Sequence, residues 1–207
     1  MQTIKDLNKH LEESSNILVL ALMYYKDLKY LSKPIEPQEQ IIVFKYLAFQ
    51  RIKYSAWVLT VLELCKLFIN RETEKYNFHK LLTFLLDSYD RTKWKSAFEK
   101  DKILKLKSKL ENENQTTIRK LEKLRDKFYA HTDKNIAQLV SRLSIDFIEI
   151  DILINLAIEI FNEIEINYFD RQTVFETPGP DRFNHILINL AKFQEYRDKE
   201  IQAKWNK

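Results

Sequence analysis

The stretch IDFIEIDILINLAIEIFNEIEINYF, residues 145–169, contains neither glycine nor proline and carries most weight for the fold class. Apolar residues recur along it three or four positions apart, which predicts one long helix with an apolar stripe. The predicted stripe comprises Ile145, Ile148, Ile152, Leu156, Ile160 and Ile164, and it is widened by Leu153, Ala157 and Phe161. Alternating segments such as FIEIDILI could mimic strands, but one long helix is the favoured interpretation.

Composition supports an all-α chain. The 207 residues include one glycine and four prolines, whereas folds rich in strands need many turns and hence many such residues. A chain of this length is expected to build one good core. The sequence therefore predicts an all-α, up-and-down helical bundle.

Further helices are expected on both sides of this stretch, separated by short polar loops. Pro34 and Pro37 end the first helix, because proline removes a backbone donor and disfavours helix before it. The predicted helices span residues 3–31, 39–70, 78–86, 93–110, 117–129 and 182–203. We expect a helical domain over residues 1–176 and, within 177–207, a C-terminal helix that packs on the same domain.

Several features predict a cytoplasmic protein. The single cysteine, Cys65, excludes an intramolecular disulfide framework and a cysteine-cluster metal site. No secretion signal is recognisable at the N-terminus. The apolar runs are interrupted by charges before they reach the ~20 residues of a membrane span, so no membrane partner is expected.

Charge is distributed unevenly along the chain. Residues 91–134 contain 14 Lys/Arg and 7 Asp/Glu, a balance of +7, whereas residues 146–176 contain 1 and 8, a balance of −7. One interpretation is that two helical regions attract each other through solvated faces. The other is a positive surface for phosphate groups.

The stretch LRDKFYAHTDKN, residues 124–135, gathers polar and titratable side chains at the end of the basic region. On the preceding helix Ile118, Leu121, Leu124 and Phe128 form a core stripe, which places Arg125 at the edge of the buried face. In an uninterrupted helix Arg125 and His131 would lie about 120° apart. They can meet only if the helix stops before His131, or if another chain completes the cleft.

An arginine and a histidine together suit the cleavage of RNA by transesterification. Histidine exchanges a proton near neutral pH, and arginine holds a phosphate through two N–H groups. No metal or cofactor is needed, and His10, His79 and His185 show no ligand spacing. On residue types alone an ordinary helix end is the simpler interpretation, because a cation near a helix C-terminus is favourable.

The segment RDKFYAH, residues 125–131, resembles the motif of the HEPN superfamily, in which an arginine and a polar residue precede a histidine. The following HTD resembles the abortive-infection AbiU-type branch. The order of two long helices, a short apolar helix and a charged helical region is also similar. The resemblance extends to about Phe169.

This resemblance implies a four-helix HEPN core with additional helices and a homodimer whose two motifs face each other. It implies a metal-independent endoribonuclease acting on RNA in toxin–antitoxin, abortive-infection or other phage-defence settings, with an antitoxin or inhibitor protein as a further partner. Arg125 and His131 are then the catalytic residues, and Asp126 would orient one of them. Tyr129, Thr132 and Asp133 are supporting candidates.

Two other hypotheses remain open. The chain could be a non-catalytic HEPN-type module that binds RNA or a protein, or a helical scaffold whose motif is coincidental. The surface formed by Leu153, Ala157 and Phe161 could contact a second copy or be ordinary core.

Overall fold

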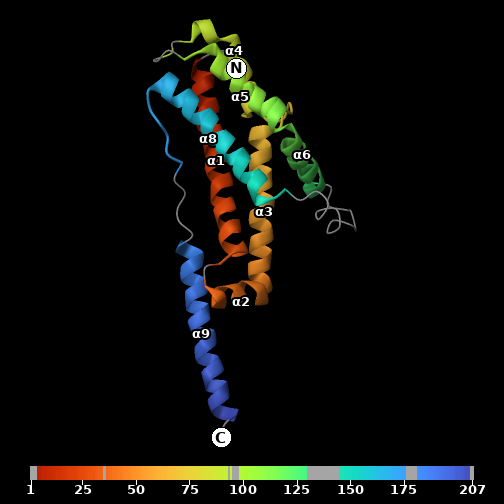
Figure 1. Cartoon of the computed structure of the whole chain (residues 1–207), viewed down its shortest axis with the longest axis vertical. Coiled ribbons are helices and arrows are strands. Elements are labelled where there is room, and N and C mark those ends of the chain that lie inside the picture. Colours follow the sequence, from red (N-terminus) through yellow and green to blue (C-terminus); the bar gives the residue numbers. More distant parts are fainter. Residues whose placement is uncertain are drawn as a thin grey trace. The chain divides into compact units, whose positions relative to one another are not determined.

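The computed structural model describes residues 4–34, 36–92, 94, 98–129, 145–175 and 181–205. Within these ranges the chain is helical and contains no strand (Figure 1), which confirms the predicted all-α bundle. The α-helices are α1 (Ile4–Ser32), α2 (Pro37–Lys45), α3 (Leu47–Phe68), α4 (Phe78–Asp87), α5 (Lys100–Ser108), α6 (Gln115–Tyr129), α8 (Phe147–Phe169) and α9 (Asp181–Trp205). A 3-10 turn, η1 (Tyr89–Arg91), follows α4, and a π-turn, η2 (Lys109–Glu113), follows α5.

The chain forms two compact units. The larger comprises Met1–Leu22 and Thr60–Glu176, and the smaller comprises Met23–Leu59 and Thr177–Lys207. The C-terminal helix α9 therefore belongs to the same unit as α2. The expected domain over residues 1–176 stays a prediction.

The long helix α8 is the predicted one. It begins after Asp146, whose carboxylate accepts a hydrogen bond from the backbone N–H of Glu149 at 2.7 Å and caps the helix. Its middle is lined by Leu153, Ala157 and Phe161, which are completely buried. These three side chains are ordinary core of the larger unit and do not form a surface for a second copy.

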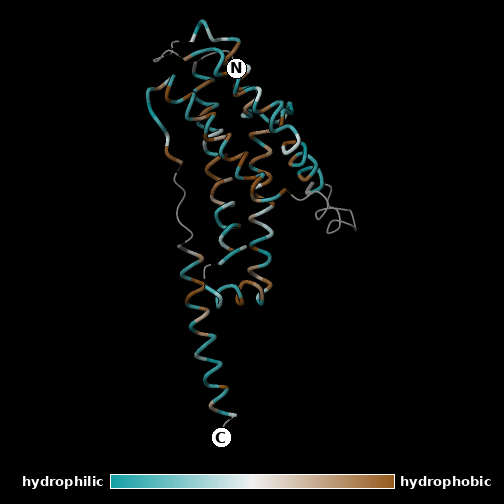
Figure 2. Tube along the Cα trace, viewed as in Figure 1, coloured by the Kyte–Doolittle hydropathy of each residue, from teal (hydrophilic) through white to brown (hydrophobic). Residues whose placement is uncertain are grey.

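The apolar stripe predicted for this helix is wrong in its first part, where Ile148 and Ile152 are 70% and 45% exposed. The stripe was built mainly on four-residue steps, and each such step turns about 40° around a helix. Over several steps the predicted stripe therefore rotates away from the face of α8 that packs in the core. The buried face instead starts at Ile150 and continues through Leu153 and Ile154. Figure 2 shows hydrophobic and hydrophilic residues alternating along the helices, as expected where one face packs and the other meets water.

An aromatic cluster joins three helices of the larger unit. The rings of Phe68 on α3 and Phe161 on α8 lie 5.3 and 5.6 Å from that of Phe78 on α4, both edge to face. Such contacts add about 0.5–1.5 kcal/mol each to the free energy gained by burial. The cluster fixes the start of α4, and with it the loop of residues 69–77 that precedes it.

The predicted helix over residues 39–70 is interrupted in the structure. Tyr46 is extended, with φ −96° and ψ 116°, and separates α2 from α3. The break lets Val43 and Phe49 enter one core with Leu187 of α9. Phe44 is 85% exposed as a result.

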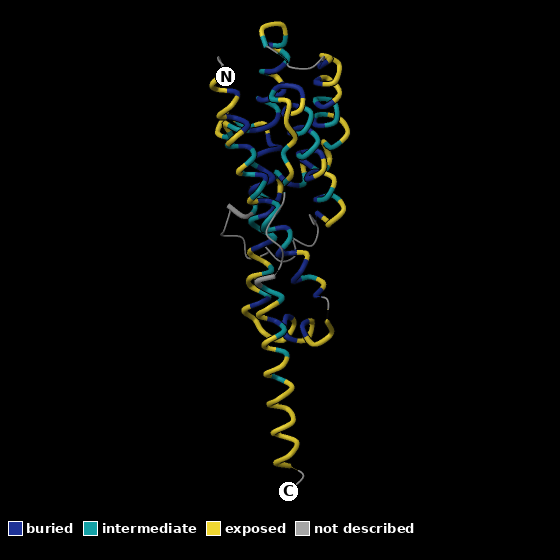
Figure 3. Tube along the Cα trace, turned by 90° about the vertical axis from the view of Figure 1, so that its left-hand side faces the viewer, coloured by how far each residue is buried: buried dark blue, intermediate teal, exposed yellow. Residues whose placement is uncertain are grey.

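The last turns of α9 have no core of their own, since residues 195–205 are exposed throughout (Figure 3). None of the helices in the described ranges is long and apolar enough to span a bilayer.

The basic and acidic regions of the sequence contact each other in the larger unit. Three lysines of the basic region pair with carboxylates of α8. The pairs are Lys102–Glu163 at 3.6 Å, Lys109–Glu159 at 2.6 Å and Lys120–Glu149 at 2.5 Å. Mutual attraction of two helical regions therefore accounts for part of the uneven charge.

Candidate functional site

Helix α6 carries the first part of the arginine–histidine motif. Its residues Ile118, Leu121 and Leu124 are buried, as the sequence predicts. Arg125 comes next, and its side chain is only 14% exposed. The arginine thus lies at the edge of the core, and Nη1 of its guanidinium is itself buried.

Glu74 holds the guanidinium of Arg125. Nη2 of Arg125 lies 2.9 Å from Oε1 of Glu74, whose side chain is 18% exposed. Both charges are largely removed from water, so salt screens this pair less than a pair at the surface. The contact determines where the positive charge of Arg125 is placed.

Arg71 makes a second bridge to α6. Its Nη2 donates to Oδ2 of Asp126 at 2.9 Å, and its Nε and Nη2 donate to Oε1 of Glu122 at 3.1 and 2.9 Å. The hydrogen bond to Asp126, followed by that to Glu122, raises the pKa of Arg71. Asp126 thus bonds to the loop before α4, and its expected role in orienting a catalytic residue stays a prediction.

Arg71 and Glu74 both belong to the loop of residues 69–77, and Lys80 on α4 fixes this loop. Nζ of Lys80 donates to the backbone carbonyls of Arg71, Glu72 and Glu74 at 3.1, 3.1 and 2.7 Å. An ammonium group has three donors, so all of them are used. Asn77 adds two bonds, accepting from the backbone N–H of Lys80 at 2.9 Å and donating to the carbonyl of Glu74 at 2.7 Å.

Sequence reasoning missed Arg71 and Glu74, because it treated residues 70–77 only as a loop. It missed Lys80 because it assigned this residue only to the helix of residues 78–86. The one available signal was a loop with charges of both signs directly before a helix. No spacing rule connects Arg71 with Glu122, since they are 51 positions apart and tertiary packing brings them together.

A comparison with protein families identifies the chain. The family model HEPN_AbiU2, described as AbiU2, matches residues 4–186. This chain belongs to the AbiU2 family of HEPN proteins. The resemblance seen in RDKFYAH is thereby confirmed. No curated protein and no solved structure matches the chain.

The second half of the HEPN motif lies outside the described residues. These residues are His131, Thr132 and Asp133, and the side chain of Tyr129 at the end of α6 is also outside them. The separation of Arg125 from His131, and their shared use of one phosphate, therefore remain predictions.

Two other histidines of this HEPN chain are bound to the backbone. Nε2 of His10 lies 3.1 Å from the carbonyl of Asn77, and Nε2 of His79 lies 3.1 Å from that of Phe68. Within the described ranges no three His, Cys, Asp or Glu side chains gather where a metal ion could bind.

Cys65 lies beneath α6, and its thiol donates to the carbonyl of Leu121 at 3.5 Å. Burial raises the pKa of this thiol, and Arg125 opposes the shift only in part. The thiol stays protonated near neutral pH, which makes it a poor nucleophile.

Proposed function

We propose that this chain is a metal-independent endoribonuclease of HEPN type that acts as a homodimer in phage defence, as a toxin or an abortive-infection component. Family membership supports the proposal. The structural observation that carries it is the placement of Arg125, at the edge of the core with its guanidinium 2.9 Å from a fixed carboxylate. An arginine held in this way is positioned in advance for an anion.

The reaction is transesterification within RNA. His131 accepts the proton of a ribose 2′-hydroxyl, and the 2′-oxygen forms a bond to the adjacent phosphorus. The bond from phosphorus to the 5′-oxygen breaks, and that oxygen takes up a proton. Arg125 stabilises the negative charge that grows on the phosphoryl oxygens. The products are a 2′,3′-cyclic phosphate and a 5′-hydroxyl.

The proposed site is built by two copies of the chain. In a helix that continued to His131, this residue and Arg125 would lie about 120° apart, and one copy alone would offer poor geometry for both to reach one phosphate. A twofold axis brings two arginines and two histidines to one cleft. One histidine then serves as base and the other as acid.

In the proposed reaction, Glu74 competes with RNA for the guanidinium of Arg125. A phosphate oxygen that bonds to Nη2 must replace or share the Glu74 carboxylate, which has the same charge sign and a similar hydrogen-bond geometry. Until RNA arrives, Glu74 neutralises the arginine and keeps it in place. The carboxylate thus acts as an internal substitute for the phosphate.

The proposal is tested with purified protein and RNA in EDTA. We expect cleavage that leaves 2′,3′-cyclic phosphate ends. The variants His131→Ala and Arg125→Ala should be inactive while retaining the helical circular dichroism of the parent. His185→Ala and Arg119→Ala are matched controls, because both side chains are exposed, and they should cleave normally.

Full cleavage by folded His131→Ala would reject the catalytic role. If the parent binds RNA or a partner protein but cleaves no RNA, the non-catalytic HEPN-type module is the correct function. Sedimentation of the parent as a monomer at micromolar concentration would reject the composite site.

A further inference from the structure

Helix α9 continues past the core of the smaller unit. In its first half Leu187 is buried in the core that includes Ile42 and Val43 of α2, whereas residues 195–205 are exposed throughout. A helix shorter than about 12–15 residues is only marginally stable in water without tertiary contacts. The exposed half of α9 would therefore be stabilised by another helix packed against it.

Two aromatic side chains stand out on this half. Phe193 is 64% exposed and Tyr196 is 62% exposed. The two residues are three positions apart, so they lie about 60° from each other and share one face of the helix. Trp205 is nine positions after Tyr196 and lies on the opposite side, about 180° away. Exposed aromatic rings gathered on one face are typical of the centre of a protein interface.

Charged residues flank Tyr196 symmetrically. Lys192 lies four positions before it and Glu200 four positions after it, so each is about 6 Å along the helix and about 40° around it from Tyr196. Both are exposed, and neither forms an ion pair with another residue in the described part of the chain. When a second α9 crosses antiparallel at Tyr196, Lys192 of each copy is level with Glu200 of the other. This face of α9 is therefore complementary to itself.

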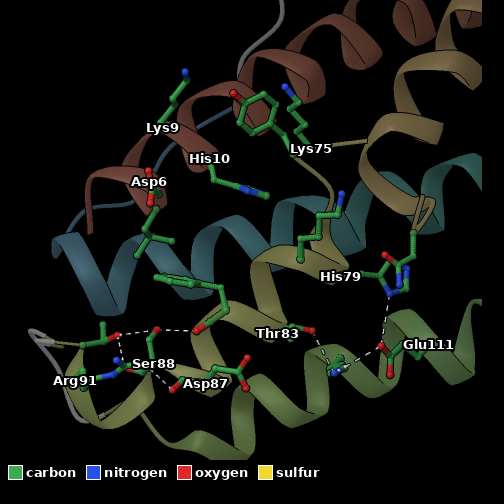
Figure 4. A pocket seen from close by; sticks show the side chains of 17 residues that line it. Asp6, Lys9, His10, Lys75, His79, Thr83, Asp87, Ser88, Arg91 and Glu111 are labelled. Carbon is green, nitrogen blue, oxygen red and sulfur yellow. Dashed lines mark hydrogen bonds and ion pairs between the residues drawn. The ribbon is translucent and has the colours of Figure 1, made fainter. Parts of the chain in front are cut away.

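Charged groups in the larger unit are paired differently, within the chain. In a groove between α4 and α5, Nδ1 of His79 lies 3.5 Å from Oε1 of Glu111, and Nζ of Lys107 donates to Oγ1 of Thr83 at 3.4 Å (Figure 4). Nζ of Lys107 also lies 3.8 Å from Oε1 of Glu111. These groups satisfy one another, whereas Lys192 and Glu200 offer their charges to a partner.

The overall charge of the exposed half argues against a strongly charged partner. Residues 192–204 contain four Lys/Arg and three Asp/Glu, a balance of +1. An anionic lipid surface attracts helices with a basic polar face, and an acidic protein surface would require the same. A second copy of α9 requires only opposite charges at equal distances from a twofold axis, which Lys192 and Glu200 supply.

We propose that α9 pairs with α9 of a second copy of this chain, antiparallel and with the twofold axis beside Tyr196. Rows of residues four positions apart pack in this way when two helices cross at about 50°. The contact involves α9 alone, so it is separate from α6 and does not depend on RNA cleavage.

The pairing is expected to be weak by itself. A fully buried aromatic side chain removes about 150–250 Å² from water. The four rings of the pair are a little more than 60% exposed before contact and together remove roughly 400–600 Å². Stable interfaces bury at least about 1,000 Å², so the two copies should associate transiently.

A disulfide that forms only in the pair detects such a contact. Facing Cα atoms of two packed helices lie about 5 Å apart, which a disulfide can span. In oxidised glutathione, we expect full-length Tyr196→Cys to form a linked dimer about tenfold faster than Asp198→Cys. Asp198 is the matched control, because it is exposed and about 160° from Tyr196. The native Cys65 is buried and does not interfere.

Charge reversal tests the register. In the Tyr196→Cys chain, Lys192→Glu and Glu200→Lys should each slow disulfide formation about threefold, because each places like charges opposite one another. The two changes together restore opposite charges and should restore the rate. Asp198→Lys, on the other side of α9, should leave the rate unchanged.

The role of the aromatic face is tested in the same Tyr196→Cys chain. Phe193→Ser should slow the reaction about fivefold, because this ring is covered in the pair. Trp205→Ser removes a ring that is 84% exposed but lies on the opposite side, and it should have no effect. Circular dichroism checks that all these variants are folded.

Three results would overturn the proposal. The first is an equal rate of disulfide formation in Tyr196→Cys and Asp198→Cys. The second is a double charge reversal that reacts as slowly as the single ones. The third is binding of the parent to phosphatidylserine vesicles through Phe193 without disulfide formation in Tyr196→Cys, which would make a lipid surface the occupant of this face.

Discussion

Replacing Glu74 by glutamine tests whether the loop of residues 69–77 holds Arg125. The side chains of the pair are 18% and 14% exposed, with 2.9 Å between Oε1 and Nη2. Removing one partner of a fully buried pair costs about 3–5 kcal/mol, and an exposed pair contributes about 0.2–1 kcal/mol. Most of the surface of this pair is covered, so we expect Glu74→Gln to lower the free energy of unfolding by about 2 kcal/mol.

The measurement is urea unfolding of the parent and the variant, followed by circular dichroism. Glu159→Gln is the matched control, because the Glu159–Lys109 pair is also close, at 2.6 Å, but its side chains are 42% and 38% exposed. That variant should lose less than about 1 kcal/mol. Equal losses in the two variants would refute the argument that burial gives the Arg125–Glu74 pair its strength.

Three further predictions follow from the same region. Lys80→Met removes the ammonium that binds three loop carbonyls, so hydrogen exchange at the amides of residues 71–74 should accelerate at least tenfold, whereas Lys75→Met should leave it unchanged. Cys65 should resist alkylation at pH 8 in the folded chain and react once urea unfolds it, because burial raises the pKa of its thiol; labelling of the folded protein at the rate of a free thiol would contradict this. Burial lowers the pKa of His10 in the folded chain to about 4, below the value of 6.5 in the unfolded chain. The unfolded chain therefore binds more protons between these two pH values. The free energy of unfolding should fall as the pH drops from about 6.5 to 4, by up to about 3 kcal/mol. His10→Gln should lose this part of the pH dependence in unfolding experiments.

The pair formed by Arg125 and Glu74 has a consequence for any nuclease activity. Without Glu74, the guanidinium of Arg125 would attract anions of all kinds. With Glu74 in place, only a ligand that binds Arg125 more tightly than this carboxylate can replace it. Specificity of this kind depends on the difference between two affinities. An RNA that also contacts other parts of the protein would therefore replace Glu74 more readily than inorganic phosphate would.

Much of the candidate site could not be predicted from the sequence. The edge position of Arg125 follows from the helical spacing of Ile118, Leu121 and Leu124, because a residue directly after a buried position lies about 100° from it. Glu74 and Arg71 gave no such signal. Their contacts join a loop to a helix that begins about 40 residues later, and loop conformation depends on Lys80 and Asn77 rather than on periodicity.

The sequence by itself determined that the chain is helical, because residues 145–169 lack helix breakers and one glycine cannot supply the turns of a sheet. It also determined the family, since the short segment RDKFYAH resembles the HEPN motif and the family model matches residues 4–186. Both conclusions depend on which residues follow one another along the chain. Only the tertiary structure decided which isoleucines of α8 are buried and where the long second helix breaks, since both depend on the neighbours that each face meets. Only the tertiary structure shows, too, that Glu74 supplies the carboxylate that binds Arg125. Contacts between distant segments are decided by the packing of side chains, and periodicity within one helix carries no information about them.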